Sequence, residues 1–312
     1  MSKTAIIGAG LMGSGIAVVY SMAGYQVSLV DVSDEVLKKS LANISDILRE
    51  LYRLGVTKDE NSDELLARIK PTTSLEEAVT GAEIVTEAVS ESLGLKIDLF
   101  EKLDTLCSKD VVLASNTSSF KISEIAQKVR NKERVIGTHW WNPPYLMPLV
   151  EIFRTQYNHD HFVKKVADLF TNVLKKEVIV CNESPGGVGV RLQAALFAEA
   201  LRICEEDVVS PSDLDKVIKL SLGLRYPMFG PFLIADLGGL DVFLNIHEYL
   251  AKKLGERFAP SKTLRDLVEK GYLGIKSSRG FYHYTGDYLR KVVKKRNDTV
   301  VEILRLQQRV DD

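Results

Sequence analysis

The chain carries the stretch Gly8-Ala9-Gly10-Leu11-Met12-Gly13 directly after a short apolar run, Ala5-Ile6-Ile7, and directly before a helical pattern. Glycine suits each of its three places, because Gly8 permits a tight turn, Gly10 lets a ligand approach the backbone, and Gly13 lets a helix pack closely on a strand. A helix that begins in this turn presents free amides and the positive end of its dipole to an anionic group. The stretch therefore predicts a strand–turn–helix unit that binds phosphate.

Asp31 supplies the second part of the same pattern. It closes the apolar run at residues 26–30 and stands 18 residues after Gly13. A carboxylate in that place accepts hydrogen bonds from the ribose hydroxyls of a dinucleotide and repels a 2′-phosphate. The next two residues, Val32 and Ser33, offer no arginine to such a phosphate. The context matches a dinucleotide-binding fingerprint and favours NAD over NADP, whereas the alternative is a glycine-rich turn that binds no nucleotide. The predicted cofactor contacts from this unit are Gly8, Gly10, Leu11, Met12, Gly13 and Asp31.

Short apolar runs and helical patterns alternate over the first 180 residues, which is the rhythm of a parallel sheet with crossover helices. Ser184-Pro185-Gly186-Gly187 is the strongest break in the chain, and only helical patterns follow it. The sequence therefore predicts an α/β fold with an N-terminal Rossmann-like NAD-binding domain, residues 1–183, and an all-α C-terminal domain, residues 184–312. Strands are expected at residues 5–7, 26–30, 82–86, 111–114, 134–137 and 178–180, and helices at 11–23, 33–54, 192–206, 212–220, 239–254, 264–270 and 288–309.

The composition excludes several classes of protein. The 312 residues include 41 Lys and Arg against 42 Asp and Glu, a net charge of −1, which leaves no electrostatic footprint for nucleic acid or for an anionic membrane surface. No apolar run reaches the roughly 18 residues of a membrane span, and the N-terminus does not resemble a signal peptide. Cys107, Cys181 and Cys204 share no short spacing, so neither a zinc knuckle nor a disulfide framework is indicated. We expect a cytoplasmic protein that acts on a small-molecule substrate.

Two titratable residues stand out near the middle of the chain. His139 ends a predicted strand, and ligands bind at strand ends in open α/β sheets. The alternative is a histidine that is satisfied in the core or at its rim. Glu151 lies 12 residues later inside an otherwise apolar strand pattern, and it requires a partner because a buried acid is rare unless it is paired. The spacing leaves open whether that partner is His139.

The other polar clusters have simpler interpretations. His159 and His161 precede an amphipathic helix, and a helix start accounts for them without a metal ion. The basic runs Lys164-Lys165, Lys175-Lys176 and residues 294–296 are interpreted as solvated helix faces. No metal site is expected.

Three further motifs carry a resemblance to a known family. In order, they are Ser115-Asn116-Thr117-Ser118-Ser119, His139-Trp140-Trp141-Asn142-Pro143 and Leu149-Val150-Glu151. Together with the C-terminal stretches Gly230-Pro231-Phe232 and Arg279-Gly280-Phe281-Tyr282, they make the chain resemble the 3-hydroxyacyl-CoA dehydrogenase family over nearly all of its length. The resemblance implies an NAD-dependent oxidoreductase of fatty acid metabolism that forms a homodimer through its helical C-terminal domain.

The resemblance also implies roles for individual residues. His139 matches the catalytic histidine of the family, and Glu151 matches the acid that orients it. Ser118 matches the serine that contacts the reacting oxygen, and Asn142 matches the asparagine of the loop after the histidine. The additional cofactor contacts that it implies are Glu91, Lys96 and Asn116.

One segment departs from the family pattern, which there reads Pro-Gly-Phe-x-x-Asn-Arg-Leu. This chain has Pro185-Gly186-Gly187-Val188-Gly189-Val190-Arg191-Leu192, so Val190 replaces an asparagine that is expected near the substrate. Within a helix each glycine costs about 0.5–1 kcal/mol relative to alanine. Gly187 and Gly189 are therefore expected to loosen the start of the helix between the two domains.

These observations predict reversible hydride transfer between C3 of an L-3-hydroxyacyl-CoA thioester and NAD, with His139 and Glu151 as the general acid/base pair. Two alternatives stay open. Ser210-Pro211-Ser212-Asp213-Leu214-Asp215 and the later Gly223-Leu224-Arg225-Tyr226 also resemble the gulonate dehydrogenase and lambda-crystallin branch and the carnitine dehydrogenases, whose substrates carry no CoA. Val190 also fits an NAD-binding relative whose catalysis has weakened.

Overall fold

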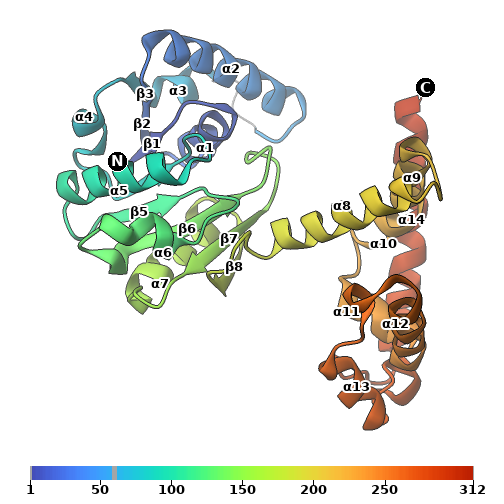
Figure 1. Ribbon diagram of the computed structural model, residues 1–312. Coiled ribbons are helices and arrows are strands. Elements are labelled where there is room, and N and C mark those ends of the chain that lie inside the picture. The colour runs from blue at the N-terminus through green and yellow to red at the C-terminus, as the bar shows by residue number, and fades with distance from the viewer. Residues whose placement is uncertain (1, 58–61, 312) are drawn as a thin grey trace. The chain divides into compact units, whose positions relative to one another are not determined.

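The computed structural model describes residues 2–57 and 62–311. Within them, eight strands form one sheet in the order β3-β2-β1-β4-β5-β6-β7-β8 (Figure 1). Every neighbouring pair is parallel except β6 and β7, which pair antiparallel. The strands are β1 Lys3–Ile7, β2 Gln26–Val30, β3 Ile69–Thr72, β4 Ile84–Glu87, β5 Val112–Ser115, β6 Val135–Trp140, β7 Leu149–Arg154 and β8 Glu177–Asn182.

Helices cover both faces of this sheet, because the buried strands are apolar on both sides. In β1, Ile6 points into one core cluster, while Ala5 and Ile7 point into the other. The first cluster packs against α1 Leu11–Met22, α2 Asp34–Arg53, α3 Ser62–Ala67 and α7 Asp160–Asp168. The second packs against α4 Leu75–Val79, α5 Leu93–Leu106 and α6 Ile122–Ile125. The predicted fold class, a Rossmann-like α/β domain followed by helices, is confirmed.

Two features of the sheet differ from the prediction. Strand β3 was not expected, because its four residues include Pro71 and only Ile69 is buried. It lies at the edge of the sheet, where a proline is tolerated since no neighbour needs its missing N–H. The antiparallel pair β6–β7 also interrupts the parallel order that the alternation of elements indicated.

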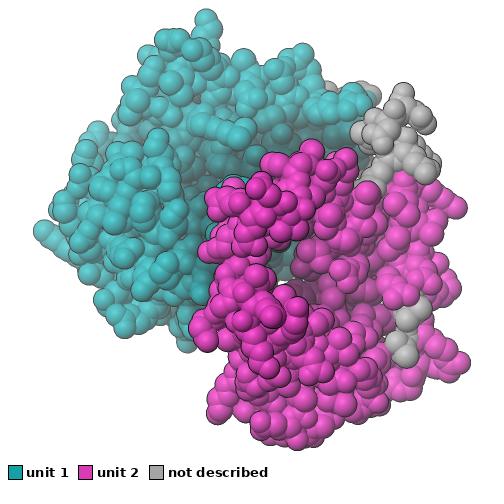
Figure 2. All heavy atoms as spheres, turned by 45° about the vertical axis from the view of Figure 1, so that its right-hand side comes forward, with its two compact units in different colours: residues 1–197 teal, residues 198–312 magenta. Residues whose placement is uncertain are grey.

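The remaining chain is helical, with α8 Gly189–Glu205, α9 Pro211–Val217, α10 Gly223–Arg225, α11 Pro231–Gly238, α12 Leu240–Leu254, α13 Lys262–Glu269 and α14 Tyr288–Asp311. Compactness divides the chain into residues 1–197 and 198–312, inside α8 (Figure 2). The predicted limit after residue 183 stands just before that helix, and the domain limits stay a prediction. No helix in the described part of the chain is long and apolar enough to cross a bilayer.

The second unit has a small core of its own. Ala235, Leu240 and Leu264 are its buried apolar centre. Asp236 is fully buried beside them and accepts the backbone N–H of Phe281 and the hydroxyl of Tyr284. A buried carboxylate is tolerated only with such partners, so these bonds tie the end of α11 to the chain before α14.

Candidate active site

The antiparallel pair β6–β7 brings His139 and Glu151 together. Its register sets His139 directly opposite Glu151, although 12 positions separate them in the sequence. Nδ1 of His139 lies 2.7 Å from Oε2 of Glu151, and the two side chains are 6% and 1% exposed. The buried acid therefore has a partner, and the partner is His139.

Glu151 is held as a carboxylate. Its Oε1 accepts the backbone N–H of Gly189, the first residue of α8, at 2.9 Å. Burial raises the pKa of Glu151, but hydrogen bonds from the imidazole and from two backbone amides at the start of α8 outweigh it, so the pKa lies below its ordinary value. An ionised carboxylate only accepts hydrogen bonds. Nδ1 of His139 therefore carries the proton in the neutral ring, and Nε2 keeps a lone pair.

Ser118 faces the other edge of the imidazole. Its Oγ lies 3.3 Å from Nε2 of His139, in the exposed loop after β5. Glu91, in the loop between β4 and α5, fixes this position. Its Oε1 accepts the Thr117 hydroxyl at 2.7 Å and the backbone N–H groups of Ser118 and Ser119 at 3.0 and 2.9 Å. One carboxylate thus sets where the hydroxyl lies beside the imidazole.

Glu91 belongs to a charge cluster with Lys96 and Glu87. Nζ of the fully buried Lys96 lies 2.6 Å from Oε1 of Glu87 and 3.2 Å from Oε2 of Glu91. Glu87 also accepts the Ser115 hydroxyl at 2.6 Å. Burial raises the pKa of Glu91, but hydrogen bonds from a threonine hydroxyl and from Lys96 outweigh it, so the pKa is lowered. Sequence reasoning missed Glu87, although an acid that closes an apolar run is the signal that singled out Asp31.

The glycine-rich turn fits the pyrophosphate of a dinucleotide. Gly8 has φ +101°, and a Cβ there would lie 2.6 Å from the carbonyl oxygen of Ala88. A Cβ on Gly13 would lie 1.8 Å from the carbonyl oxygen of Gly8, whereas one on Gly10 would meet nothing within 4 Å. Within the described residues no side chain caps the start of α1. The turn is therefore open at Gly10, and the first amides of the helix are available to phosphate.

Comparisons with known families cover most of the chain. Residues 3–184 match the model of the 3-hydroxyacyl-CoA dehydrogenase NAD binding domain, and residues 186–284 match that of the 3-hydroxyacyl-CoA dehydrogenase C-terminal domain. The chain belongs to the 3-hydroxyacyl-CoA dehydrogenase family. It is an oxidoreductase, and its cofactor is NAD.

Three relatives of this dehydrogenase illustrate the range of the family. A probable 3-hydroxybutyryl-CoA dehydrogenase of Bacillus subtilis (strain 168) is 38% identical over 280 residues, which are 89% of this chain and 96% of that protein. The crystal structure of the 3-hydroxyacyl-CoA dehydrogenase from Archaeoglobus fulgidus has a TM-score of 0.81, with 35% identity over 99% of both chains. The 5-formyl-3-hydroxy-2-methylpyridine 4-carboxylate 5-dehydrogenase of Mesorhizobium japonicum is 28% identical over 97% of both chains.

The other predicted site residues lie directly after β2, at the start of α1 and in the loops after β5 and β6. Asp31 directly follows β2 beside the glycine-rich turn, where its Oδ2 accepts the N–H of Ala9 at 2.8 Å. Asn116 joins the loop after β5 to β6, because its Oδ1 accepts the N–H of Trp140 at 3.0 Å. Asn142 lies exposed in the loop after β6. Leu11 and Met12 form the start of α1, with Leu11 exposed.

The structure shows that one sequence interpretation was wrong. Lys176 is not part of a solvated helix face: it directly precedes β8 and is 7% exposed. Its Nζ donates to the carbonyl oxygens of Pro144 and Met147, at 2.6 and 2.8 Å, and lies 5.8 Å from the ring centroid of Trp140. Burial lowers the pKa of Lys176. The buried Lys176 ammonium therefore holds the loop that carries Asn142 in place. Because its acceptors are backbone carbonyls, which every residue has, the sequence gives no sign of this role.

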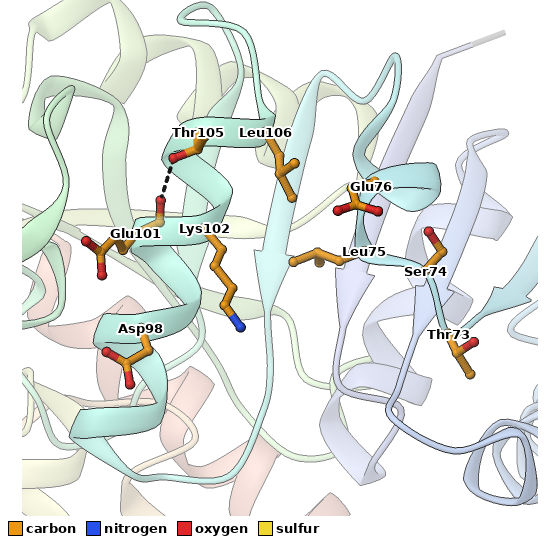
Figure 3. A pocket seen from close by; sticks show the side chains of 9 residues that line it. All are labelled: Thr73, Ser74, Leu75, Glu76, Asp98, Glu101, Lys102, Thr105 and Leu106. Carbon is orange, nitrogen blue, oxygen red and sulfur yellow. Dashed lines mark hydrogen bonds between the residues drawn. The ribbon is translucent and has the colours of Figure 1, made fainter.

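A cavity of about 950 Å³ lies elsewhere in the first unit, between the start of α4 and α5 (Figure 3). Ser74 and Glu76 line one side, and Asp98, Glu101 and Lys102 line the other. None of the predicted site residues lines it. The volume of this cavity therefore does not point to the residues that the sequence predicts for the site.

Proposed function

We propose that this member of the family catalyses the reversible oxidation of an L-3-hydroxyacyl-CoA to the 3-oxoacyl-CoA, with NAD as cofactor. One observation carries the proposal. An ionised Glu151 lies 2.7 Å from Nδ1 of His139, which leaves Nε2 as a proton acceptor beside the Ser118 hydroxyl. When bound, NAD takes up the hydride that leaves the substrate carbon.

His139 moves the proton in this proposal. In the oxidation direction its Nε2 accepts the proton of the substrate hydroxyl, and in the reverse direction the imidazolium returns a proton to the 3-oxo oxygen. Glu151 stabilises the positive charge on the ring and keeps Nδ1 protonated, as the acid of a hydrolase triad does. A side chain that accepts and donates protons near neutral pH suits a reversible reaction.

Hydrogen-bond donors complete the proposed site. Ser118 and Asn142 donate to the substrate oxygen where negative charge develops. Glu91 and Asn116 act at the nicotinamide end. Because Lys96 is fully buried, it acts by holding Glu91 in place. The adenosine and pyrophosphate contacts are Gly8, Gly10, Leu11, Met12, Gly13 and Asp31.

A second candidate function is the oxidation of a smaller substrate without CoA. The Mesorhizobium japonicum relative is named for a pyridine carboxylate and matches 97% of this chain. The gulonate and carnitine dehydrogenases that residues 210–226 resemble belong to this candidate function, because their substrates also lack CoA.

We also propose that the chain forms a homodimer through its C-terminal helices. Large apolar side chains of the second unit are exposed, namely Leu220, Phe232 and Tyr249. A surface rich in such residues is typical of an interface between subunits.

The His139→Gln variant tests the mechanism. We expect turnover of acetoacetyl-CoA with NADH to fall by about 10²–10⁴, because the ring that transfers the proton is lost. NAD affinity, measured by calorimetric titration, should stay unchanged, since the imidazole lies outside the glycine-rich turn. Near-normal turnover in this variant would remove His139 from the mechanism.

The choice of substrate separates the candidate functions. Assays should offer acetoacetyl-CoA, gulonate, carnitine and the pyridine carboxylate side by side, and we expect turnover of the CoA thioester. Turnover of one of the other three alone would establish the second candidate. NAD binding without turnover of any of the four would indicate a weakened relative, and Val190→Asn should then raise the rate.

A further inference from the structure

Two aromatic rings flank the imidazole of His139. The Trp141 ring meets it edge-on, with ring centroids 5.2 Å apart, and the Phe153 ring lies nearly parallel to it at 6.2 Å. Trp141 follows His139 by two positions, and Phe153 follows Glu151 by two. Because side chains alternate along a strand, Phe153 lies on the same face of β7 as Glu151, and Trp141 directly follows the end of β6.

Each ring rests against a glycine of the segment that leads into α8. A Cβ on Gly189 would lie 2.2 Å from Cζ2 of Trp141, and a Cβ on Gly187 would lie 2.4 Å from Cζ of Phe153. Real Cβ atoms essentially never approach a neighbour closer than 3.0 Å. Neither glycine can therefore gain a side chain while the rings keep their places.

Close packing holds the indole in its position. Within the described residues, the buried Nε1 of Trp141 has no hydrogen-bond partner. The ring is instead held between the imidazole of His139 and the backbone of Gly189. A position that depends on close packing is sensitive to the volume of a single methyl group.

The same backbone holds the carboxylate. Gly189 donates its N–H to Oε1 of Glu151 at 2.9 Å, while Oε2 of Glu151 is bonded to His139. Since α8 begins at Gly189, the positive end of the helix dipole faces the carboxylate and stabilises it. The start of α8 therefore contacts the acid through its N–H group and the indole through its Cα.

We propose that Gly189 and Trp141 are positioning residues for the proton-transfer pair. The indole of Trp141 packs against the backbone of Gly189 and so sets the distance between the start of α8 and the carboxylate of Glu151. Because that carboxylate is hydrogen-bonded to Nδ1 of His139, this distance also sets the orientation of the imidazole ring. Gly187 and Phe153 repeat this arrangement with a second ring beside the imidazole. The proposal rests on the proposed function, in which His139 moves the substrate proton. The sequence alone predicts that Gly187 and Gly189 loosen the start of the helix. In this proposal they have the opposite effect, because the absence of their side chains lets two aromatic rings pack against the backbone beside His139.

A double-mutant cycle tests the size match. Gly189→Ala adds one methyl group where the indole sits, so we expect turnover to fall about tenfold to hundredfold, as displacements of about 1 Å can do. Adding Trp141→Phe removes the ring atoms nearest to that methyl and should restore most of the loss. Trp141→Phe alone should cost less than about tenfold. NAD affinity should stay unchanged in all three variants.

Gly94 provides the matched control, since it lies in the first turn of α5 and a Cβ there would meet nothing within 4 Å. Gly94→Ala should leave turnover unchanged. If Gly189→Ala leaves turnover unchanged, as Gly94→Ala should, then Gly189 and Trp141 do not position the proton-transfer pair. If Trp141→Phe fails to restore the rate of Gly189→Ala, the two positions are not matched in size, and the proposal is equally wrong.

A second measurement does not depend on turnover. The Nδ1 proton of His139, in its bond to the carboxylate, should give a far-downfield proton NMR signal that His139→Gln removes. We expect Gly189→Ala to broaden this signal and the double variant to sharpen it again. Should Gly189→Ala fail to fold, Trp141→Ala replaces it, and an unchanged sharp signal in that variant would overturn the proposal. If His139→Gln retains normal turnover, the proposed function fails. The downfield NMR signal of the Nδ1 proton still decides whether Gly189 and Trp141 position His139 and Glu151.

Discussion

Two glycine-rich segments of the chain, residues 8–13 and residues 186–189, resemble each other in composition and differ in what lies beside them. In the first, the space next to Gly10 is open, so the missing side chain leaves room for a ligand. In the second, the spaces next to Gly187 and Gly189 are filled by aromatic rings of the protein itself. The first segment leaves its backbone open at Gly10, as the proposed cofactor contact requires, whereas aromatic rings of the protein cover the backbone of the second.

The difference shows how far a local pattern can be interpreted. A run of glycines indicates that something approaches the backbone closely, but it does not say what. At residues 8–13 the adjacent strand and helix supply the answer, because they create a helix N-terminus that favours phosphate. At residues 186–189 the answer comes from Trp141 and Phe153, which stand 48 positions before Gly189 and 34 before Gly187.

The largest effect is expected for Gly13→Ala in the first segment. The new methyl would lie 1.8 Å from the carbonyl oxygen of Gly8, and a backbone atom cannot rotate away. We expect a loss of about 3 kcal/mol in unfolding free energy, with NAD binding abolished. Urea unfolding and calorimetric titration of NAD measure the two effects. Parent-like stability would show that the turn tolerates a side chain at its tightest contact.

Gly187→Ala should have the next largest effect, and it probes the second segment. Its φ of +58° strains any other residue by about 1–2 kcal/mol, and the methyl would also collide with the Phe153 ring. Adding Phe153→Leu should recover the part of the lost unfolding free energy that comes from the collision with the ring. The part that comes from the strained backbone at residue 187 should remain. If the second substitution recovers nothing in urea unfolding, the ring does not fill the space that this glycine leaves.

Gly10→Ala should have the smallest effect on the fold and separates the two segments most sharply. Nothing lies within 4 Å of the added methyl, so the urea unfolding curve should match that of the parent. NAD affinity should weaken about tenfold, equivalent to about 1.4 kcal/mol, because the methyl occupies the opening toward the phosphates. Unchanged NAD affinity in calorimetry would mean that the cofactor does not use this opening.

Much of the fold could be predicted, because its signals are local. The run Ala5-Ile6-Ile7, the glycine-rich turn and Asp31 are close in sequence, and together they indicate a strand, a helix and a cofactor. Strand β3 escaped prediction, since an edge strand needs few apolar residues and tolerates Pro71. The antiparallel direction of β7 also escaped it, because an apolar run carries no information about its orientation in a sheet.

The sequence predicted individual residues of the candidate site, but it did not predict which of them lie in contact. His139 and Glu151 each stood out by position, but their pairing depends on the register of β6 and β7. Lys176 gave the wrong signal, because two adjacent lysines are usually solvated and its partners are backbone carbonyls. Glu87 gave a usable signal that was missed, as it closes an apolar strand just as Asp31 does.

By itself, the sequence determined the order of domains, many of the strands and helices, and the cofactor, because helix and strand periodicity and the spacing of glycines act over a few residues. Only the tertiary structure decided which carboxylate meets which imidazole, and what covers the second glycine-rich segment. Those contacts join β6, β7 and the start of α8, which are distant in sequence. Burial of apolar side chains in the two cores of the sheet brings these elements together, and no short stretch of sequence encodes it.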